Sequence, residues 1–203
     1  MRKSPRERRL LSDYKGVQQL MRESSIFSFE ASGKPPQRYR LFFKGHGLFR
    51  PNPNVVEIRD HHEILIDLGA AYPRMVPNLA WQTPVFHPNI SNNGVVCLGG
   101  YGKHWVPSLT LAELCTMLWD MIRYKNFDVE SPYNREAALW AKTQNAMRLP
   151  LDPRSIRDRV ENNSFAPQKN SESGTSVEIV ETGIEVVSRP QPPLDDVGIV
   201  FRD

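Results

Sequence analysis

Residues 83–107 read TPVFHPNISNNGVVCLGGYGKHWVP, a stretch rich in Pro, Gly and Asn without helical or alternating periodicity. Long irregular segments in compact domains often carry function. This one holds a His-Pro-Asn tripeptide, a cysteine eight residues later, and then Trp-x-Pro. The cysteine, Cys97, has small neighbours that leave room for an incoming peptide, and a thiolate exchanges acyl groups readily. The stretch is therefore a candidate acyl-transfer site on a loop.

The chain before this stretch predicts one helix and a meander. Ser4-Pro5-Arg6-Glu7 has a capping residue, Pro at the first helical position and Glu three residues after the cap, which predicts a helix to about Arg22. Short runs with β-branched or aromatic residues follow, separated by Gly, Pro and Asn. They predict four antiparallel strands, over residues 26–31, 38–44, 61–68 and 79–82.

The chain after this stretch predicts helices and then a tail. Apolar residues at helical spacing predict a helix over 111–122, capped by Thr110 or Ser108. Asn134 is expected to cap another helix to about residue 147, and Asp152-Pro153 to open a short last one. Few large apolar residues follow Glu161, too few to offset the entropy of ordering. We expect a folded domain over 1–160 and a flexible acidic tail over 161–203.

Composition excludes several classes of protein. No stretch approaches the roughly 20 apolar residues of a membrane span, and no apolar run follows the basic start as in a signal peptide. The two cysteines lie far apart, without a CxxC pair, so we expect free thiols in a reducing cytoplasm and neither a disulfide framework nor a zinc site.

Positive charge gathers at the start of the chain, although the net charge is only +3. Residues 1–22 hold seven Lys or Arg against two acids, which predicts a docking face for an acidic partner around Arg6, Arg8 and Arg9. Nucleic-acid binding is not expected, because these basic residues lack interleaved aromatics.

Tyr72-Pro73-x-x-x-Pro77, His87-Pro88-Asn89, Cys97 and Trp105-x-Pro107 together resemble the ubiquitin-conjugating enzyme family over residues from about 5 to 150. The resemblance implies an α+β fold, the UBC fold, with an N-terminal helix, a four-stranded antiparallel meander, an active-site loop and C-terminal helices. It also implies a transferase that accepts a ubiquitin-like protein from an activating enzyme as a thioester on Cys97 and passes it to an amine, usually lysine. No metal or organic cofactor is implied.

The resemblance gives roles to the neighbouring residues. Asn89 either stabilises the oxyanion that forms when an amine attacks the thioester, or ties down its own loop, and both roles stay open. His87 is expected to support the loop rather than act as a base, because Pro88 fixes the backbone and no orienting acid is evident. Trp105 and Pro107 are expected to be structural.

Two other positions are read from the same pattern. The family often has an acid near the incoming amine, and here Asp128 takes that role by spacing from Cys97, whereas alignment places Ser131 there. Cys115 lies on the apolar stripe of a predicted helix and is expected in the core.

The sequence departs from the family pattern in three places: Arg74 replaces a usual Phe, Val106-Pro107-Ser108 replaces Ser-Pro-Ala, and two glycines, at 99 and 100, follow Leu98. A ligase partner is therefore left open, and the sequence resembles homologues encoded in bacterial operons, some linked to antiphage defence. Two alternatives are a non-catalytic UBC module that binds a ubiquitin-like protein, and a cysteine protease. The first lacks the active cysteine, and the second needs a triad that the His-Pro-Asn context does not supply.

Overall fold

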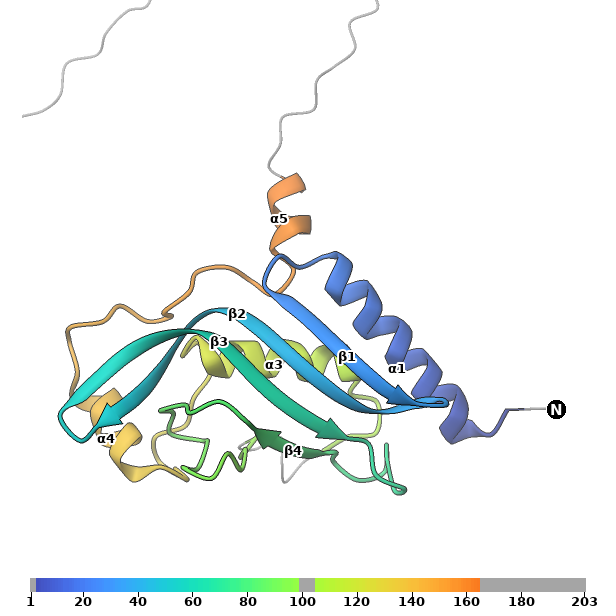
Figure 1. Ribbon diagram of the computed structural model, residues 1–203, viewed down its shortest axis with the longest axis horizontal. Helices are drawn as coiled ribbons and strands as arrows, with labels where there is room; N and C mark the ends of the chain where they lie inside the picture. The colour runs from blue at the N-terminus through green and yellow to red at the C-terminus, as the bar shows by residue number, and fades with distance from the viewer. Residues whose placement is uncertain (1–2, 99–104, 165–203) are drawn as a thin grey trace, which may run out of the picture. The chain divides into compact units, whose positions relative to one another are not determined.

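The part of the chain that the structure describes forms one helix, four strands and three further helices, in that order (Figure 1). The computed structural model describes residues 3–98 and 105–164. The helices are α1 (Pro5–Arg22), α3 (Leu111–Ile122), α4 (Arg135–Thr143) and α5 (Asp158–Ser164). The strands are β1 (Phe27–Gly33), β2 (Pro36–Asn52), β3 (Val55–Asp67) and β4 (Asn78–Trp81). Along the described ranges, no helix has both the length and the apolar character needed to cross a bilayer.

The start of α1 confirms the predicted capping box. The Glu7 backbone N–H donates to the Ser4 hydroxyl at 3.1 Å, and the Ser4 N–H donates to the Glu7 carboxylate at 3.4 Å. These bonds satisfy donors that a helix start leaves without partners, and Pro5 at the first helical position has no N–H to satisfy.

The four strands pair in the order β1-β2-β3-β4, all antiparallel, which confirms the meander. β2 runs well past its predicted end and β3 begins well before its predicted start, with irregular register at Lys44/Gly47. Gly45 and Gly47, which resemble strand breakers in the sequence, instead allow close packing: a Cβ at Gly45 would lie 2.5 Å from Trp119, and one at Gly47 2.6 Å from His62.

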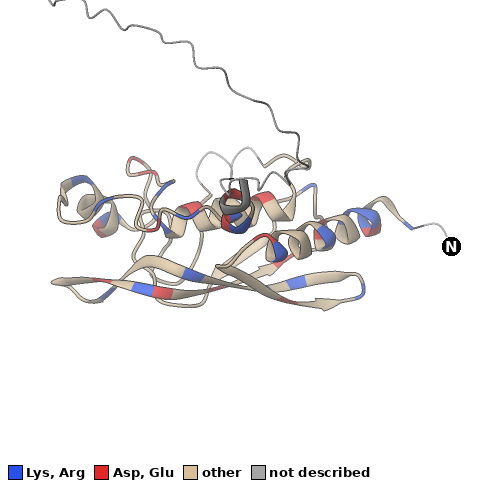
Figure 2. Cartoon of the chain, turned by 90° about the horizontal axis from the view of Figure 1, so that it is seen from above, with Lys and Arg blue, Asp and Glu red and all other residues tan. Residues whose placement is uncertain are grey.

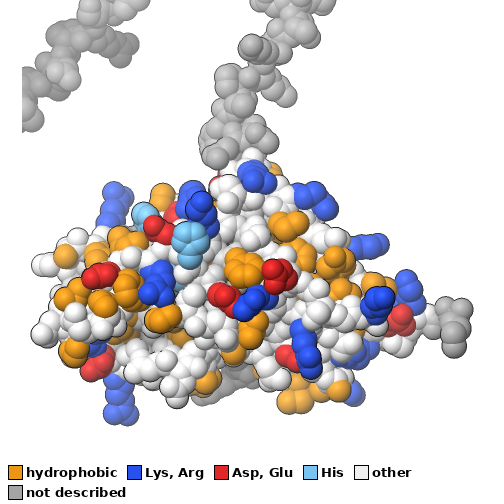
Figure 3. All heavy atoms as spheres, in the orientation of Figure 1, with side chains coloured by type: hydrophobic (Ala, Val, Ile, Leu, Met, Phe, Trp, Pro, Cys, Tyr) orange, Lys and Arg blue, Asp and Glu red, His pale blue; other side chains and the backbone are white. Residues whose placement is uncertain are grey.

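Helices cover one face of this sheet (Figure 2). α1 packs on β1, where the Tyr14 and Phe29 rings meet edge to face at 6.1 Å, and α3 packs on β2, where Trp119 stacks on Phe43 at 6.0 Å. The face toward the viewer in Figure 3 mixes hydrophobic side chains with charged ones. Fully buried side chains of the core come from α1, β2, β3 and α3, among them Leu10, Leu41, Ile64, Leu118 and Trp119.

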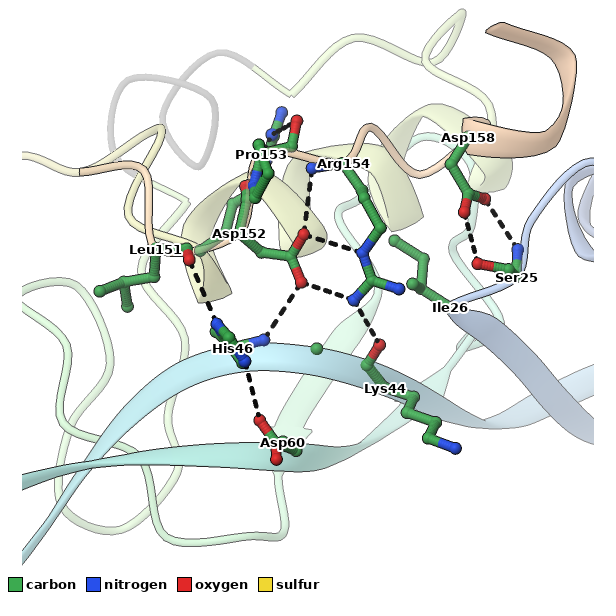
Figure 4. A network of polar contacts seen from close by, with 12 residues as sticks. Ser25, Ile26, Lys44, His46, Asp60, Leu151, Asp152, Pro153, Arg154 and Asp158 are labelled. Carbon is green, nitrogen blue, oxygen red and sulfur yellow. Dashed lines mark hydrogen bonds and ion pairs between the residues drawn. The ribbon is translucent and has the colours of Figure 1, made fainter. Parts of the chain in front are cut away.

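The chain from Asp152 onward differs from its prediction. Asp152 does not open a helix: its buried carboxylate accepts N–H groups from the Arg154 backbone and guanidinium, at 3.0, 2.9 and 2.6 Å, and from the His46 backbone at 3.4 Å (Figure 4). A side chain that holds the chain against β2 in this way cannot cap a helix. α4 also ends earlier than predicted, at Thr143, and α5 begins only at Asp158.

α5 continues through residues 161–164, so the first residues of the predicted tail are helical. Its first residue, Asp158, accepts the backbone N–H of Ser25 at 2.8 Å and also the Ser25 hydroxyl. Residues 165–203, the rest of the predicted tail, lie outside the described residues.

We expect Asp152→Asn to lower the free energy of unfolding at neutral pH by about 1–3 kcal/mol, because buried donors lose their charged acceptor. Burial acts to raise the pKa of Asp152, but the hydrogen bonds from Arg154 outweigh it and the pKa is lowered. A carboxylate with a lowered pKa stabilises the fold at pH values above its unfolded pKa of about 3.9. This contribution is lost as the pH falls through the pKa of the folded state. The variant should therefore lose less stability in acid than the wild type.

Denaturant unfolding across the acid range measures both effects. Asp67→Asn is the matched control, because Asp67 pairs with Arg38 on the exposed face, and surface pairs contribute about 1 kcal/mol or less. Equal stability and equal acid dependence of Asp152→Asn and wild type would contradict the role of this carboxylate.

Candidate functional site

Backbone hydrogen bonds hold Cys97 in place. Its N–H donates to the carbonyl of Asn89 at 2.8 Å, which joins the cysteine to the His-Pro-Asn tripeptide. Just before it, Val95 forms an antiparallel bridge with Ala80 of β4, and the Trp81 N–H donates to the carbonyl of Gly94 at 2.8 Å. Cys97 itself is a free thiol of intermediate exposure. The segment therefore extends the edge of the sheet and leaves the thiol partly accessible.

A tight turn before Cys97 depends on Gly94. The Gly94 N–H donates to the Ser91 carbonyl and the Ser91 N–H to the Val95 carbonyl, both at 2.9 Å. Gly94 has a φ of +78°, and a Cβ there would lie 2.1 Å from the carbonyl oxygen of Trp81. Any other residue would meet both an unfavourable backbone conformation and a clash with β4.

We expect Gly94→Ala to displace the Cys97 segment from β4. The unfavourable φ alone costs about 1–2 kcal/mol, and the clash adds to it, because the obstructing atom is backbone. A lower melting temperature and a changed rate of Cys97 alkylation should follow. Gly69→Ala is the control, because nothing lies within 4 Å of a Cβ at that position. Matching behaviour of the two variants would contradict this account of the turn.

His87 lies beneath the loop. It is fully buried, its Nδ1 accepts the Asn89 N–H at 3.1 Å, and its ring meets the edge of Tyr124 at 4.9 Å. Burial lowers the pKa of His87 to about 3, so the imidazole is neutral at physiological pH. This geometry supports the loop and does not expose a base to solvent. The neighbouring Pro88 is also buried, and its carbonyl accepts the N–H groups of Tyr133 and Asn134 at 2.8 and 2.9 Å.

Asn89 joins the tripeptide to the segment that follows α3. Its side-chain amide donates to the carbonyl of Asp128 at 2.8 Å, and its side-chain oxygen accepts the Asp128 N–H at 2.7 Å. The residue is 3% exposed. Both bonds tie the loop that carries Asn89 to the segment after α3, which is one of the two roles considered for this residue. An amide nitrogen carries two N–H groups, and the Asp128 carbonyl accepts one of them.

The Asp128 carboxylate caps its own turn. One oxygen, Oδ1, accepts the backbone N–H groups of Glu130 at 2.8 Å and Ser131 at 3.3 Å. Ser131, the other candidate for the acidic position, is exposed. The structure thus brings Asp128 next to Asn89 through the backbone, with its carboxylate engaged in the turn.

Tyr133 is the residue that sequence reasoning missed. The charge on Cys97 is the main cause that raises the pKa of Tyr133, whose phenol is exposed. The signal was present in Ser131-Pro132-Tyr133-Asn134, because the family pattern has an apolar Leu where Tyr133 stands.

Trp105 and Pro107 connect the loop to two other parts of the fold. The Trp105 indole N–H donates to the carbonyl of Pro73 at 2.6 Å, and its ring lies 6.2 Å from that of Tyr72. The Pro107 carbonyl accepts a hydrogen bond from Arg9. Trp105 is therefore held against the segment between β3 and β4, and Pro107 against α1.

The three arginines of the predicted docking face are not equivalent. Arg6 donates to the carbonyls of Leu68 and Gly69, both at 3.0 Å. Arg9 pairs with buried Asp13 at 2.7 Å, and Asp13 also accepts the Tyr72 hydroxyl at 2.7 Å and the Leu111 N–H at 3.0 Å. Arg8 is exposed and donates to the Lys3 carbonyl at 2.9 Å. Arg6 and Arg9 thus anchor α1 within the domain, and Arg8 faces solvent.

Metal ligands are not gathered anywhere in residues 3–98 and 105–164, where no group of three His, Cys, Asp or Glu side chains could hold an ion.

An N-terminal helix, an antiparallel four-stranded meander and later helices match the ubiquitin-conjugating fold. A family model described as ubiquitin-conjugating enzyme matches residues 34–148, more than half of the chain. The chain belongs to the ubiquitin-conjugating enzyme family.

Two known proteins illustrate the relationship. "Ubiquitin-conjugating enzyme E2 16" of Schizosaccharomyces pombe is 35% identical over 79 residues, which cover 38% of this chain and about half, 48%, of that protein. The solved structure of S. cerevisiae Ubc12 has a TM-score of 0.57 at 18% identity and covers 79% of this chain and 80% of its own. This second likeness supports the fold alone.

Proposed function

We propose that the chain is a ubiquitin-conjugating-type transferase that carries a ubiquitin-like protein as a thioester on Cys97. The observation that carries the proposal is the part-exposed thiol on a segment whose backbone is fixed to both β4 and Asn89. A fixed, accessible thiol is suited to exchange acyl groups with two large protein partners in turn. Such a thiol must stay reduced, so we place the reaction in the cytoplasm.

The reaction consists of two acyl transfers. The Cys97 thiolate first attacks the thioester carbonyl of the modifier on an activating enzyme, a new C–S bond forms, and the enzyme's thiolate leaves. An amine, such as that of lysine, then attacks the carbonyl on Cys97. A C–N bond forms, the C–S bond breaks with its electron pair on sulfur, and the proton that the amine gives up passes to solvent. Neither transfer needs a cofactor on this chain, because the thioester already stores the energy of activation.

The neighbouring residues have supporting roles in this proposal. Asn89 ties the loop through Asp128, and its remaining amide N–H is the donor for the oxyanion of the second transfer. Asp128 positions Asn89 through its backbone. It is also our candidate for the acid near the incoming amine. His87, Pro88, Trp105 and Pro107 hold the loop.

Substitution of Cys97 by Ser tests the proposal through the chemistry of the bond. With the cognate activating enzyme, modifier and ATP, wild-type protein should give an adduct that thiol reductant removes. Cys97→Ser should give an oxyester that survives reductant and is cleaved by alkali, because the ester has no sulfur to exchange. An adduct of Cys97→Ser that survives alkali would place the modifier elsewhere. A wild-type chain that binds the modifier without any adduct would be a non-catalytic module.

The exposed face of α1 is our proposed docking site for the activating enzyme. Because Arg6 and Arg9 serve the fold, Arg8→Glu is the variant that tests docking alone. We expect charging of Cys97 to slow about three- to tenfold, more at low salt, while discharge to free lysine stays unchanged. Arg22→Glu, at the other end of α1, is the control. Charging kinetics of Arg8→Glu that match the control across a salt series would contradict docking at this face.

The departures from the family pattern bear on the source of the protein and on its ligase partner. Arg74, which replaces the usual aromatic anchor, is exposed, as are Val106 and Pro107. We infer an operon-encoded conjugation system, of the kind linked to antiphage defence, from the departures in sequence. Adjacent genes for an activating enzyme and a ubiquitin-like protein would identify both partners, and their absence would contradict this origin.

A further inference from the structure

The segment that carries Cys97 folds back on the His-Pro-Asn tripeptide as a short hairpin. Ile90 forms an antiparallel bridge with Val96. The Cys97 N–H donates to the Asn89 carbonyl at 2.8 Å, and this bond closes the base of the hairpin. We call residues 89–97 the Cys97 hairpin. The position of the thiol therefore depends on how this hairpin is held in the fold.

The tip of the Cys97 hairpin is joined to the start of α4. There the Asn134 amide nitrogen donates to the side-chain oxygen of Asn92 at 3.0 Å, across 42 positions of the sequence. The oxygen of the same amide accepts the Ala137 N–H at 3.0 Å and caps α4. Because the cap uses the oxygen, the nitrogen of Asn134 faces the hairpin, and Asn92 has to present an acceptor to it.

The start of α4 also holds the base of the Cys97 hairpin. The N–H groups of Tyr133 and Asn134 donate to the Pro88 carbonyl, directly before Asn89, at 2.8 and 2.9 Å. Asn134 is buried. The hairpin is thus fastened to one helix start at two points. Backbone bonds hold its base, and in the part of the chain that the structure describes, the side chain of Asn92 joins its tip to α4.

Neither packing nor backbone conformation accounts for an asparagine at position 92. Asn92 and its neighbour Asn93 are both exposed. Among the described residues, Tyr124 is the one non-glycine residue with a positive φ, so the turn accepts other residues at both positions. Asn93 makes no side-chain hydrogen bond within residues 3–98 and 105–164. The bond to Asn134 is therefore what distinguishes Asn92 from Asn93.

We propose that Asn92 is a positioning residue, which holds the Cys97 hairpin against α4 so that the thiol keeps one place while two large protein partners react with it in turn. The effect on transfer rests on the proposed function, whereas the anchoring of the hairpin belongs to the uncharged chain. Reacting atoms must meet at a narrow range of distances and angles, and a shift of about 1 Å can cost about 10²-fold in rate. A hairpin released at its tip therefore slows both acyl transfers.

Hydrogen exchange in the uncharged protein, followed by NMR, tests the anchoring. Asn92→Ala removes the acceptor and leaves the cap of α4 in place. We expect the amides of Ser91 and Cys97, which bond within the hairpin, to exchange about three- to tenfold faster than in the wild type. Asn93→Ala is the matched control, because it makes the same change at the next residue of the turn. Asn92→Asp keeps an oxygen for the amide of Asn134 and should restore the protection.

Single-turnover kinetics with the cognate activating enzyme, modifier and ATP test the effect on transfer. We expect Asn92→Ala to lower the maximal rates of charging and of discharge to free lysine about three- to tenfold. The concentrations of activating enzyme and of lysine that give half the maximal rate should stay unchanged. Asn93→Ala and Asn92→Asp should match the wild type. Loss of folded protein alone would lower the amplitude of the reaction and not its rate constant.

Wild-type protection of the hairpin amides in Asn92→Ala would overturn the proposal, and so would equal effects of Asn92→Ala and Asn93→Ala. Faster exchange with unchanged maximal rates would also refute it, because the hairpin would then be anchored without any consequence for transfer. A wild-type chain that forms no adduct would count against the proposed function instead. The exchange measurement would still decide whether Asn92 anchors the hairpin.

Discussion

Cys97→Ala is expected to abolish the reductant-sensitive adduct completely, whereas Cys115→Ala should retain it. Alanine has no atom that can hold the acyl group, so the loss should be total rather than partial. Cys115 is fully buried in α3, and burial raises the pKa of its thiol, which keeps it uncharged and unreactive. Non-reducing electrophoresis after incubation with the activating enzyme, modifier and ATP gives the comparison.

The stability of Cys115→Ala must be checked in the same buffer, because removal of a buried thiol leaves a small cavity in the core. We expect a destabilisation of about 1 kcal/mol and normal charging below the melting temperature. Equal loss of the adduct in both variants, each shown to be folded, would contradict the assignment of Cys97.

Asn89→Ala is expected to slow discharge to free lysine by about 10²–10³-fold, the usual cost of one oxyanion donor. Charging should change much less, provided that the loop stays in place. The melting temperature should also fall, because the two bonds to the Asp128 backbone are lost from a buried site. Single-turnover charging and discharge, measured separately, distinguish the two roles.

A matched control for the loss of loop support is Asn134→Ala, which removes the cap of α4 and the bond to Asn92. This variant should lower stability without a selective effect on discharge. If Asn89→Ala instead slows charging and discharge equally, its contribution is to tie the loop, and the oxyanion role is excluded.

Local signals made much of the fold predictable. The capping box at Ser4 and Glu7 and the cap at Thr110 depend on residues three positions apart, and the structure has both. The order of the strands followed from β-rich runs between turn residues. Such patterns are set by the backbone within one element, so a single sequence reveals them.

Contacts between distant segments were not predictable in the same way. Gly45 and Gly47 have the composition of a strand end, yet β2 continues through them, and the missing side chains leave room for Trp119 and His62. Asp152 has the composition of a helix cap, yet it pairs with Arg154 and the backbone of β2. In each case a tertiary contact outweighs the local preference.

The candidate site also contains residues that a local motif predicts and residues that only tertiary contacts bring together. Cys97, His87 and Asn89 were found because they lie close together in one motif. The position of Tyr133 beside this motif depends on its hydrogen bond to the Pro88 carbonyl, which only the folded chain determines. The arginines of α1 were read as one face because composition does not tell an anchoring guanidinium from an exposed one.

Intact mass of the wild-type chain, after incubation with the cognate activating enzyme, modifier and ATP, tests the central claim most directly. The account predicts an added mass of one modifier less one water, located on the Cys97 peptide and removed by thiol reductant. An added mass that resists reductant, or one located on any residue other than Cys97, would contradict it.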